Sequence, residues 1–374
     1  MQTKVKVFFP NLDGLRFFSF LIVFFSHSFF TANEEIISQR WYQILKKDIF
    51  LDGDLGVSFF FVLSGFLITY LLLTEQKINS KIDVRRFYLR RILRIWPLYY
   101  FSVFFGFVIF PIFKKYFGQI PNESADPLLC SLFLNNFDRI INGPPDSSVL
   151  SVLWSVAIEE QFYLFWPLLF LLIPKGVYYL IFPAVVLISL CFRWQYPQDD
   201  IETHTLGVIS DMALGGGLAY LSLSQTNFSR RISRMPRLFS LLPYFAALLL
   251  ILYKYDIFIS QQLVIFKRVI IGLIFGWILI DQCFNERCLL PVSKMKFATS
   301  LGRYTYGLYC LHTIALLIVV TILSIFDLDQ HAWQLWVLQV PLALGLSILM
   351  SYISYWCFES PFLNIKKRFS YISI

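Results

Sequence analysis

The sequence predicts an all-α fold: a polytopic membrane bundle of about ten transmembrane helices, with both termini in the cytosol. Hydrophobic residues make up 57% of the 374-residue chain and charged residues only 15%, where a soluble protein has about 25% charged residues. The mean hydropathy is +0.64. Several apolar runs also reach the ~20 residues that cross a bilayer as a helix.

Hydropathy divides the chain into ten predicted membrane helices. They are 12–31, 55–74, 96–113, 151–173, 177–193, 205–223, 238–254, 263–281, 301–325 and 333–357. Lys and Arg concentrate in alternate connections, chiefly 75–95 and 224–237. Because basic residues are retained on the cytosolic side, we expect these connections and both termini to lie in the cytosol.

The overall charge and the cysteines exclude several other classes of protein. A formal net charge of +8 suggests nucleic acid as a partner in a soluble protein, but here the cytosolic bias of Lys and Arg accounts for much of it. We therefore expect membrane lipid, and no nucleic acid, as a partner. The first apolar run lacks a cleavage site for a signal peptide. The six cysteines are scattered, and no His lies near Cys283 and Cys288, so no metal site is expected.

The predicted helix 12–31 carries two conspicuous polar side chains, Arg16 and His27. At about 100° per residue they share one face and lie ~16 Å apart. Ionisable side chains cost a few kcal/mol or more at membrane depth and usually mark functional sites. Snorkelling explains Arg16 without a function, but it does not explain His27. The pattern therefore favours a working pair.

The next helix and the connection after it add a packing motif and a basic cluster. Ser64 and Gly65 permit close helix packing. In the connection, Arg91 and Arg94 share a helical face, and Arg90 lies four residues before Arg94. The cluster is interpreted either as an amphipathic helix on anionic lipid or as a grip on a phosphorylated cytosolic ligand, since Arg matches phosphate geometry. The residues alone leave both open.

Three polar residues share a face of the predicted helix 151–173. Ser155, Glu159 and Tyr163 recur every fourth residue. A buried carboxylate without a partner does not stay charged, so we expect a polar neighbour for Glu159.

Two later helices hold further acids. His204 and Asp211 lie seven residues apart on one helical face, and Gly215–Gly217 allow a close approach of another helix. Near the C-terminus Glu359 precedes Pro361 by two residues.

Counting residues from the helix ends predicts two polar layers. The outer layer holds acids and an imidazole: His27, Glu159 and Asp211. The inner, mostly basic layer holds Arg16, Glu359, Arg91 and Arg94. This arrangement suggests a charged ligand that enters from the cytosol and a proton-transfer site deeper in the membrane.

These motifs, taken together, resemble the acyltransferase-3 family of bacterial inner-membrane acyltransferases, of the O-antigen and exopolysaccharide O-acetylase type. They are LDGLR with Arg16 and His27, GVSFFFVLSGFLIT, FYLRRILRIWPLYY, LWSVAIEEQFYLFWP, SLGRYTYGLYCLHT and the final Glu359 and Pro361. Ser58 stands where many members have Asp. Some members carry a C-terminal extracytoplasmic hydrolase-like domain; here we expect one transmembrane acyltransferase domain over 1–374.

The resemblance implies a multi-pass O-acetyltransferase of the bacterial inner membrane. It implies acyl-coenzyme A, most often acetyl-coenzyme A, as the cytosolic donor, and no metal. The acceptor is a hydroxyl of a cell-envelope glycan or lipid-linked sugar.

The resemblance also carries roles for single residues. It assigns His27 as the general base and Arg16 as the group that positions the donor or stabilises developing charge. It assigns Arg91 and Arg94 to the coenzyme A phosphates or to an inner gate, and Glu359 to orienting one of them. Depth suggests that Glu159 orients His27.

The acceptor-side candidates are Asp211, His204 and Tyr163. His312 matches a recurrent family position, where a packed and a reacting histidine are equally compatible with the pattern.

The alternative hypothesis is a transporter or flippase of an envelope precursor. Such proteins also bury charges near the membrane midplane, but they often show internal repeats and helices broken at the site, and neither pattern is found. A non-catalytic scaffold would leave the aligned Arg16 and His27 without a cause.

Overall fold

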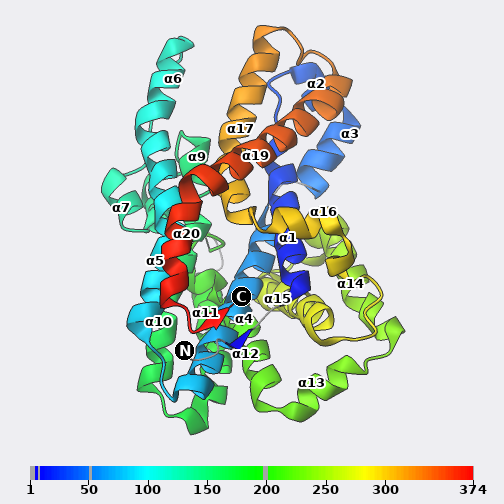
Figure 1. Ribbon diagram of the computed structural model, residues 1–374. Coiled ribbons are helices and arrows are strands. Elements are labelled where there is room, and N and C mark those ends of the chain that lie inside the picture. The colour runs from blue at the N-terminus through cyan, green and yellow to red at the C-terminus, as the bar shows by residue number, and fades with distance from the viewer. Residues whose placement is uncertain (1–4, 7–8, 50–52, 197–200, 374) are drawn as a thin grey trace.

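The computed structural model describes residues 5–6, 9–49, 53–196 and 201–373, and nearly all of these ranges are helical (Figure 1). The predicted all-α membrane bundle is therefore confirmed. The described residues add one pair of two-residue strands, β1 (Val5–Lys6) and β2 (Ile372–Ser373).

The longer helices form the bundle. They are α1 (Pro10–Ser28), α4 (Asp54–Asn79), α5 (Val84–Phe104), α10 (Trp154–Leu172), α11 (Ile181–Gln195), α12 (Thr205–Ser224), α14 (Arg237–Ile257), α15 (Gln261–Phe284), α17 (Thr305–Ile325) and α19 (Val340–Ser354).

Shorter helices connect or extend them. They are α2 (Glu34–Ser38), α3 (Arg40–Gln43), α6 (Phe110–Tyr116), α7 (Pro127–Ser131), α8 (Asn135–Asn142), α9 (Ser148–Ser151), α13 (Thr226–Ser233), α16 (Lys296–Gly302), α18 (Ala332–Gln334) and α20 (Ser360–Lys366). The π-helical segments are η1 (Ile44–Ile49), η2 (Phe105–Ile109), η5 (Leu335–Gln339) and η6 (Tyr355–Glu359), and the 3₁₀ segments are η3 (Lys175–Leu180), η4 (Val292–Lys294) and η7 (Lys367–Phe369).

Nine helical stretches among the described residues are long and apolar enough to cross a membrane. Each coincides with a predicted segment, and the tenth predicted segment coincides with α1, a helix of 19 residues. α1 is not among the nine. It carries Asn11, Asp13, Arg16 and His27, so its polar groups need partners or a cavity inside the bundle.

Three predicted boundaries differ from the structure. The predicted helix 96–113 begins instead at Val84, because the Asp83 side chain accepts a hydrogen bond of 3.0 Å from the Arg86 backbone N–H and caps it. The Arg-rich stretch therefore continues a membrane helix. The predicted helix 301–325 is interrupted between α16 and α17, and the last membrane segment extends to Phe369 through η6, α20 and η7.

The two ends of the chain meet on one side of the bundle. β1 and β2 pair in parallel, Val5 with Ile372 and Lys6 with Ser373, and Figure 1 shows both termini close together below α1 and α20. Termini on a common side agree with an even number of membrane crossings. That this side faces the cytosol stays a prediction.

Among the described helices, α4 and α12 make the most extensive contact. A Cβ at Gly65 would collide with the backbone of Met212, and a Cβ at Gly215 would collide with the backbone carbonyl of Val62. The predicted close approach at both glycine sites is confirmed. Small residues at such crossings let helix backbones come together in membranes, where van der Waals contact drives association.

Substitution of Gly215 by alanine should therefore destabilise the protein. The methyl group meets backbone atoms that cannot move aside, and overpacking of this kind costs about 1–3 kcal/mol. Gly345 on α19 is the matched control, since a Cβ there meets nothing within 4 Å, and alanine favours the helix by up to about 1 kcal/mol. Thermal unfolding in detergent should show a lower midpoint for Gly215→Ala and an equal or higher one for Gly345→Ala. Equal midpoints for the two variants would contradict the crossing.

Candidate active site

A cavity of about 620 Å³ lies among α1, α4, α5, α10, α17 and the C-terminal segment from α20 to Ser370. This volume is within the range of small-molecule and cofactor sites. The cavity reaches from the side of the bundle where the termini meet to Ser155 and Tyr309 in its interior. It is therefore the natural place for a ligand that enters from the terminal side.

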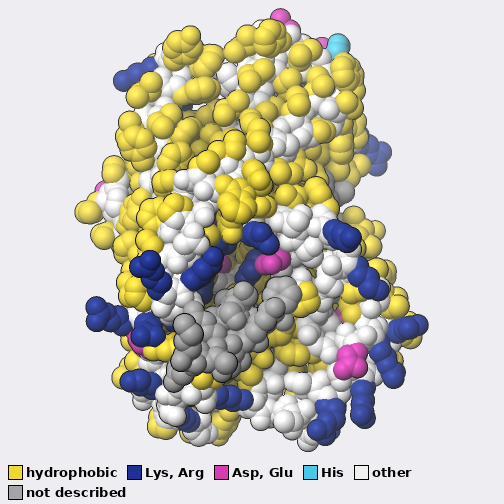
Figure 2. Space-filling model, viewed as in Figure 1, with side chains coloured by type: hydrophobic (Ala, Val, Ile, Leu, Met, Phe, Trp, Pro, Cys, Tyr) yellow, Lys and Arg dark blue, Asp and Glu magenta, His cyan; other side chains and the backbone are white. Residues whose placement is uncertain are grey.

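One wall of the cavity is strongly cationic. Within the described residues, six basic side chains line it, and we call them the cationic wall: Arg16, Arg91, Arg94, Arg303, Lys366 and Lys367. Only two carboxylates, Asp13 and Glu159, line the same cavity. Figure 2 shows Lys and Arg side chains gathered in the middle of the visible face, between α20 and α16, and over the lower half. The wall therefore suits a ligand with several negative charges.

The arginines of α5 divide into structural and cavity-facing ones. Arg90 forms a 2.7 Å ion pair with Glu75 and donates a 2.9 Å hydrogen bond to the Phe369 carbonyl. It thereby ties the C-terminal segment to α4 and α5. Arg91 and Arg94 line the cavity instead. The Nε of Arg91 is buried and has no hydrogen-bond partner among the described residues.

Arg16 joins this wall from α1. Its Nη1 pairs with Asp13 Oδ1 at 2.9 Å, one helical turn earlier. The Arg16 side chain keeps 31% exposure and the Asp13 side chain 38%, so solvent screens the pair and its net stabilisation is small. Both groups are thus available to a ligand in the cavity.

A polar cluster lies on the α10 side of the cavity. The Tyr163 hydroxyl donates to Glu159 Oε2 at 3.1 Å and also shares a hydrogen bond with Ser64 Oγ. The Arg91 guanidinium lies 5.5 Å from the centre of the Tyr163 ring, a cation–π contact. Glu159 therefore has the polar neighbour that we expected, but that neighbour is Tyr163.

His27 lies beyond the interior end of the cavity. Its Nδ1 is 2.9 Å from Nε2 of His312, and Nδ1 of His312 is 2.7 Å from the backbone carbonyl of Tyr309. Tyr309 itself lines the cavity, where its hydroxyl shares a 2.6 Å hydrogen bond with Ser155. The two histidines thus connect to the cavity through Tyr309. His27 is exposed, whereas His312 is completely buried.

His27, Glu159 and Asp211, which we expected at a common depth, have separate partners, and their common depth stays a prediction. Glu159 belongs to the cavity, His27 pairs with His312, and Asp211 belongs to a separate network described below. His27 is hydrogen-bonded to His312 and Glu159 to Tyr163, so among the described residues no direct contact supports the prediction that Glu159 orients His27. Counting residues from a helix end gives the depth of a side chain in the membrane. It does not give the neighbouring helix that the side chain faces.

Glu359 lies beside the cavity rather than in its wall. It is the last residue of the π-helical segment η6, is 5% exposed, and accepts a 3.3 Å hydrogen bond from Ser354. Arg94 is the cation that acts on it electrostatically. That Glu359 orients one of the cavity arginines stays a prediction.

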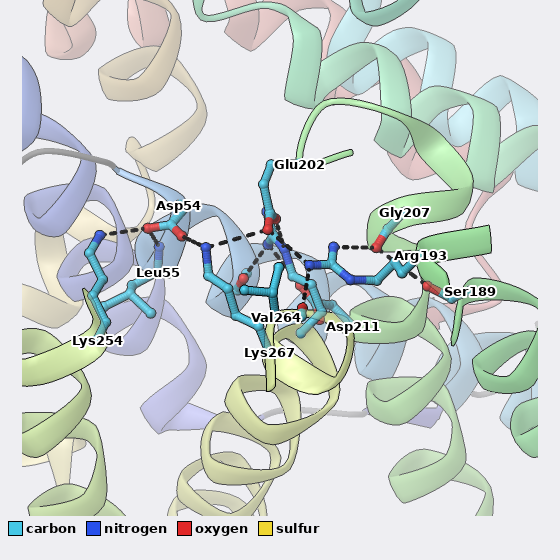
Figure 3. A network of polar contacts seen from close by, with 12 residues as sticks. Asp54, Leu55, Ser189, Arg193, Glu202, Gly207, Asp211, Lys254, Val264 and Lys267 are labelled. Atoms are coloured by element: carbon cyan, nitrogen blue, oxygen red, sulfur yellow. Dashed lines mark hydrogen bonds and ion pairs between the residues drawn. The ribbon is translucent and has the colours of Figure 1, made fainter. Parts of the chain in front are cut away.

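Asp211 takes part in a network of ion pairs across α4, α11, α12, α14 and α15 (Figure 3). Arg268 pairs with Asp211 at 3.1 Å and with Glu202 at 2.6 Å, and it also bonds Ser58. Arg193 pairs with Glu202 at 3.0 Å.

The same network continues to Asp54, which pairs with Lys254 at 3.0 Å and with Lys267 at 2.9 Å. These contacts hold five helices together. They explain why a carboxylate is buried at position 211 without any contact to a substrate. The acceptor-side role of Asp211 therefore stays a prediction.

His204 has a capping role in the structure. Its Nδ1 accepts a 3.1 Å hydrogen bond from the Leu206 backbone N–H at the start of α12. Its ring stacks on Phe192, with centroids 4.2 Å apart, and burial lowers its pKa. These contacts explain the residue structurally, and its acceptor-side role also stays a prediction.

Sequence reasoning missed half of the cationic wall. Lys366, Lys367 and Arg303 line the cavity, although the sequence suggests only a basic terminal run and a helical arginine. The available signal was the distance of Lys366 from Glu359, two helical turns along one continuous helical stretch. The fold-back of the C-terminal segment, which depends on β1 pairing with β2, has no local signal.

The fold and the cavity define a class of protein: a multi-pass helical membrane protein with an internal cavity lined by basic side chains. Among the described residues, no three His, Cys, Asp or Glu side chains are grouped closely enough to hold a metal ion.

The chain belongs to the acyltransferase-3 family. The sequence profile of this family, described as an acyltransferase domain, matches residues 9–356. The match includes α1, α5, α10 and α17, which supply most of the cavity wall. The resemblance noted from the motifs is thus confirmed.

Three curated relatives are named O-acetyltransferases. The chain is 33% identical over 176 residues to the peptidoglycan O-acetyltransferase OatA of Listeria monocytogenes, 45% of this chain and 25% of the relative. It is 34% identical over 178 residues to the putative peptidoglycan O-acetyltransferase YrhL of Bacillus subtilis, 45% of this chain and 24% of the relative.

The third is the O-acetyltransferase OatA of Staphylococcus aureus, 32% identical over 164 residues, 42% of this chain and 24% of the relative. The matched stretch thus spans about a quarter of the length of these relatives. No solved structure gives a significant match.

The ion network predicts how stability depends on pH. Burial raises the pKa of Glu202, but Arg268, Lys267 and Arg193 outweigh this effect and hold the pKa well below its usual range. A depressed carboxyl pKa stabilises the folded state at every pH above its ordinary value of 4.5, and this stabilisation is lost as the pH falls through the folded-state pKa. Glu202→Gln should therefore lower the unfolding midpoint by a constant amount between about pH 5 and 8.

The difference between the two proteins should shrink as the pH falls below about 4.5, where the carboxyl of the unfolded state becomes protonated, and should vanish below the lower pKa of the folded state. Glu34→Gln, at a surface position at the start of α2, is the control. A difference that persists unchanged at strongly acidic pH would contradict the network.

Proposed function

We propose that this protein is a membrane O-acetyltransferase, which moves an acetyl group from acetyl-coenzyme A to a hydroxyl of a cell-envelope glycan or lipid-linked sugar. The observation that supports this most is the continuity of the site. The cationic wall lines a cavity whose interior residue, Tyr309, holds His312 against His27. Arg16, near one end of α1, faces the cavity for the polyanionic donor, and His27, near the other end, is the proton acceptor.

The cavity matches the chemistry of an acyl-coenzyme A donor. Coenzyme A carries several phosphate charges at one end and its thiol at the other. Guanidinium groups bind phosphate through parallel, charge-assisted hydrogen bonds, and Arg91 has a buried Nε without a partner. We assign the phosphates to Arg91 and Arg94, with Glu359 orienting Arg94. The thioester then lies toward Tyr309 and Ser155.

The transfer step uses His27 and Arg16 of α1. His27 takes the proton from the acceptor hydroxyl while the hydroxyl oxygen forms a bond to the thioester carbonyl carbon. The carbon–sulfur bond breaks, and the proton held by His27 is returned to the leaving thiolate, so that an ester and coenzyme A with a free thiol are produced. Arg16 faces the same cavity and stabilises the negative charge that develops on the thioester oxygen.

Glu159 and Tyr163 line the donor cavity and hydrogen-bond each other. We therefore assign them to contacts with the donor rather than to the orientation of His27 or to the acceptor. The acceptor approaches His27 from its exposed side.

The names of the relatives favour a particular class of acceptor. Two of them are named as peptidoglycan O-acetyltransferases, so a glycan of the cell envelope is the acceptor that we propose to test first. A transporter of an envelope precursor, the alternative from the sequence, is disfavoured by membership of an acyltransferase family.

Arg91→Ala and Arg94→Ala should each weaken the binding of coenzyme A. Loss of a charged hydrogen bond costs about 1.5–3 kcal/mol, which corresponds to a roughly 10- to 100-fold increase in Kd. Arg85→Ala is the matched control, because Arg85 is an exposed arginine of the same helix outside the cavity. Calorimetry on the purified proteins measures the Kd of coenzyme A for all three variants. Equal small effects would instead support a lipid-anchoring role for the arginines.

His27→Ala should abolish acetyl transfer while leaving coenzyme A binding intact. A positioned general base contributes about 10²- to 10⁴-fold to the rate, and His27 lies outside the donor cavity. Transfer of labelled acetyl groups from acetyl-coenzyme A to envelope glycan in membrane vesicles provides the measurement. Retained transfer would remove His27 from the mechanism, and translocation of an envelope precursor without acetyl transfer would establish the transporter.

A further inference from the structure

His312 is a buried titratable group that the chemistry above leaves without a task. It lies in the second turn of α17, is 0% exposed, and has each ring nitrogen within hydrogen-bond distance of one partner. A buried imidazole needs a partner for each ring nitrogen, and these two contacts supply them. The identity of its partners allows the position of every proton in the pair to be deduced.

The deduction starts at the Tyr309 carbonyl, which can only accept a hydrogen bond. Nδ1 of His312, 2.7 Å away, must therefore carry a proton and donate. A neutral imidazole carries one N–H, so Nε2 of His312 has a lone pair and accepts. Its partner at 2.9 Å, Nδ1 of His27, must then be the donor. This leaves Nε2 of His27 with the free lone pair.

The surroundings of His312 favour the neutral form that this deduction needs. Phe20 and Phe24 contact its ring edge-on, with centroids 5.7 and 6.4 Å away, and Tyr309 is on a third side. No carboxylate is in hydrogen-bond contact with it among the described residues. A second proton would place an unbalanced charge among aromatic rings, which costs several kcal/mol.

The geometry of the pair also fixes the orientation of His27. The two ring planes are only 19° apart, with centroids 5.2 Å apart, so the N–H of one ring points along the lone pair of the other. Gln339 holds the end of α1 nearby, through 2.8 Å hydrogen bonds to the carbonyls of Ser28 and Phe30. The backbone that carries His27 is thus anchored.

We infer that His312 is a positioning residue: by accepting the Nδ1 proton of His27, it holds His27 in the tautomer whose Nε2 is free to take the proton of the acceptor hydroxyl. This inference rests on the proposed function, because only a reaction that removes a proton needs the Nε2 lone pair. A hydrogen bond to one imidazole nitrogen decides that the other nitrogen is the base. A base held in the wrong tautomer loses up to about 10⁴-fold in rate.

Two amide substitutions distinguish a residue 312 that must accept a hydrogen bond from His27 from one that only fills space. Glutamine is long enough to place its carbonyl oxygen near the position of Nε2, where it accepts from His27. Asparagine is shorter, and its amide reaches only the position of Nδ1, where it satisfies the Tyr309 carbonyl. His312→Gln should retain kcat within about 10-fold, and His312→Asn should lose about 10²- to 10⁴-fold.

Neither variant should change the KM for acetyl-coenzyme A where this KM reflects donor binding, because His312 does not line the donor cavity. Unfolding midpoints of both variants control for packing. An asparagine variant as active as the glutamine variant, at equal stability, would overturn the inference.

The tautomer can also be observed directly. The chain has four histidines, so ¹⁵N-histidine labelling gives a simple spectrum in detergent, and the His27→Gln and His312→Gln variants assign it. Long-range ¹H–¹⁵N correlation at neutral pH should show His27 and His312 protonated at Nδ1 and unprotonated at Nε2. A His27 resonance protonated at Nε2 and bare at Nδ1 would overturn the inference.

The two failures are distinguishable. The spectrum reports the tautomer whether or not acetyl transfer occurs, so a missing activity with the Nδ1-protonated pair intact would refute the proposed function alone. Acetyl transfer by a protein whose His27 is protonated at Nε2 would refute the role of His312 alone.

Discussion

An ionisable side chain inside a membrane bundle must face a cavity or find a partner, because an isolated charge in an apolar interior is too costly to keep. This protein meets the constraint in three ways. Arginines and lysines line a cavity, two histidines hydrogen-bond each other, and a chain of ion pairs around Arg268 ties five helices together. The first two arrangements meet on α1, and they supply the chemistry that we propose. The third is structural and keeps the helices in register.

Helix α1 is central to the site because its two ends contact different parts of it. One end presents Arg16 to the cavity, and the other presents His27 to His312. A rigid helix therefore sets the separation between the group that we assign to the donor and the group that we assign to the acceptor. Tyr309 on α17 links the two ends from the other side, since its hydroxyl lines the cavity and its carbonyl anchors His312. Reaction at this site then depends on two helices holding a fixed distance.

Much of the fold could be predicted from the sequence, because a long apolar run in a bilayer satisfies its backbone N–H and C=O groups by forming a helix. The cavity arginines Arg16, Arg91 and Arg94 could be predicted too, since they lie in motifs. The partner of His27 could not. Depth along the membrane is set by residue count, whereas the rotation of each helix and its choice of neighbour depend on packing between distant segments. Lys366 was missed for a similar reason: its place in the cavity follows from the return of the C-terminal segment to the start of the chain.

The account depends most on the claim that the cationic wall and the histidine pair serve one ligand-binding path. An experimental structure of the protein bound to coenzyme A tests this most directly. The account predicts phosphates at Arg91 and Arg94, and the thiol directed toward Tyr309 and the His27–His312 pair. Coenzyme A bound outside this cavity, or bound with its thiol directed away from Tyr309, would contradict it.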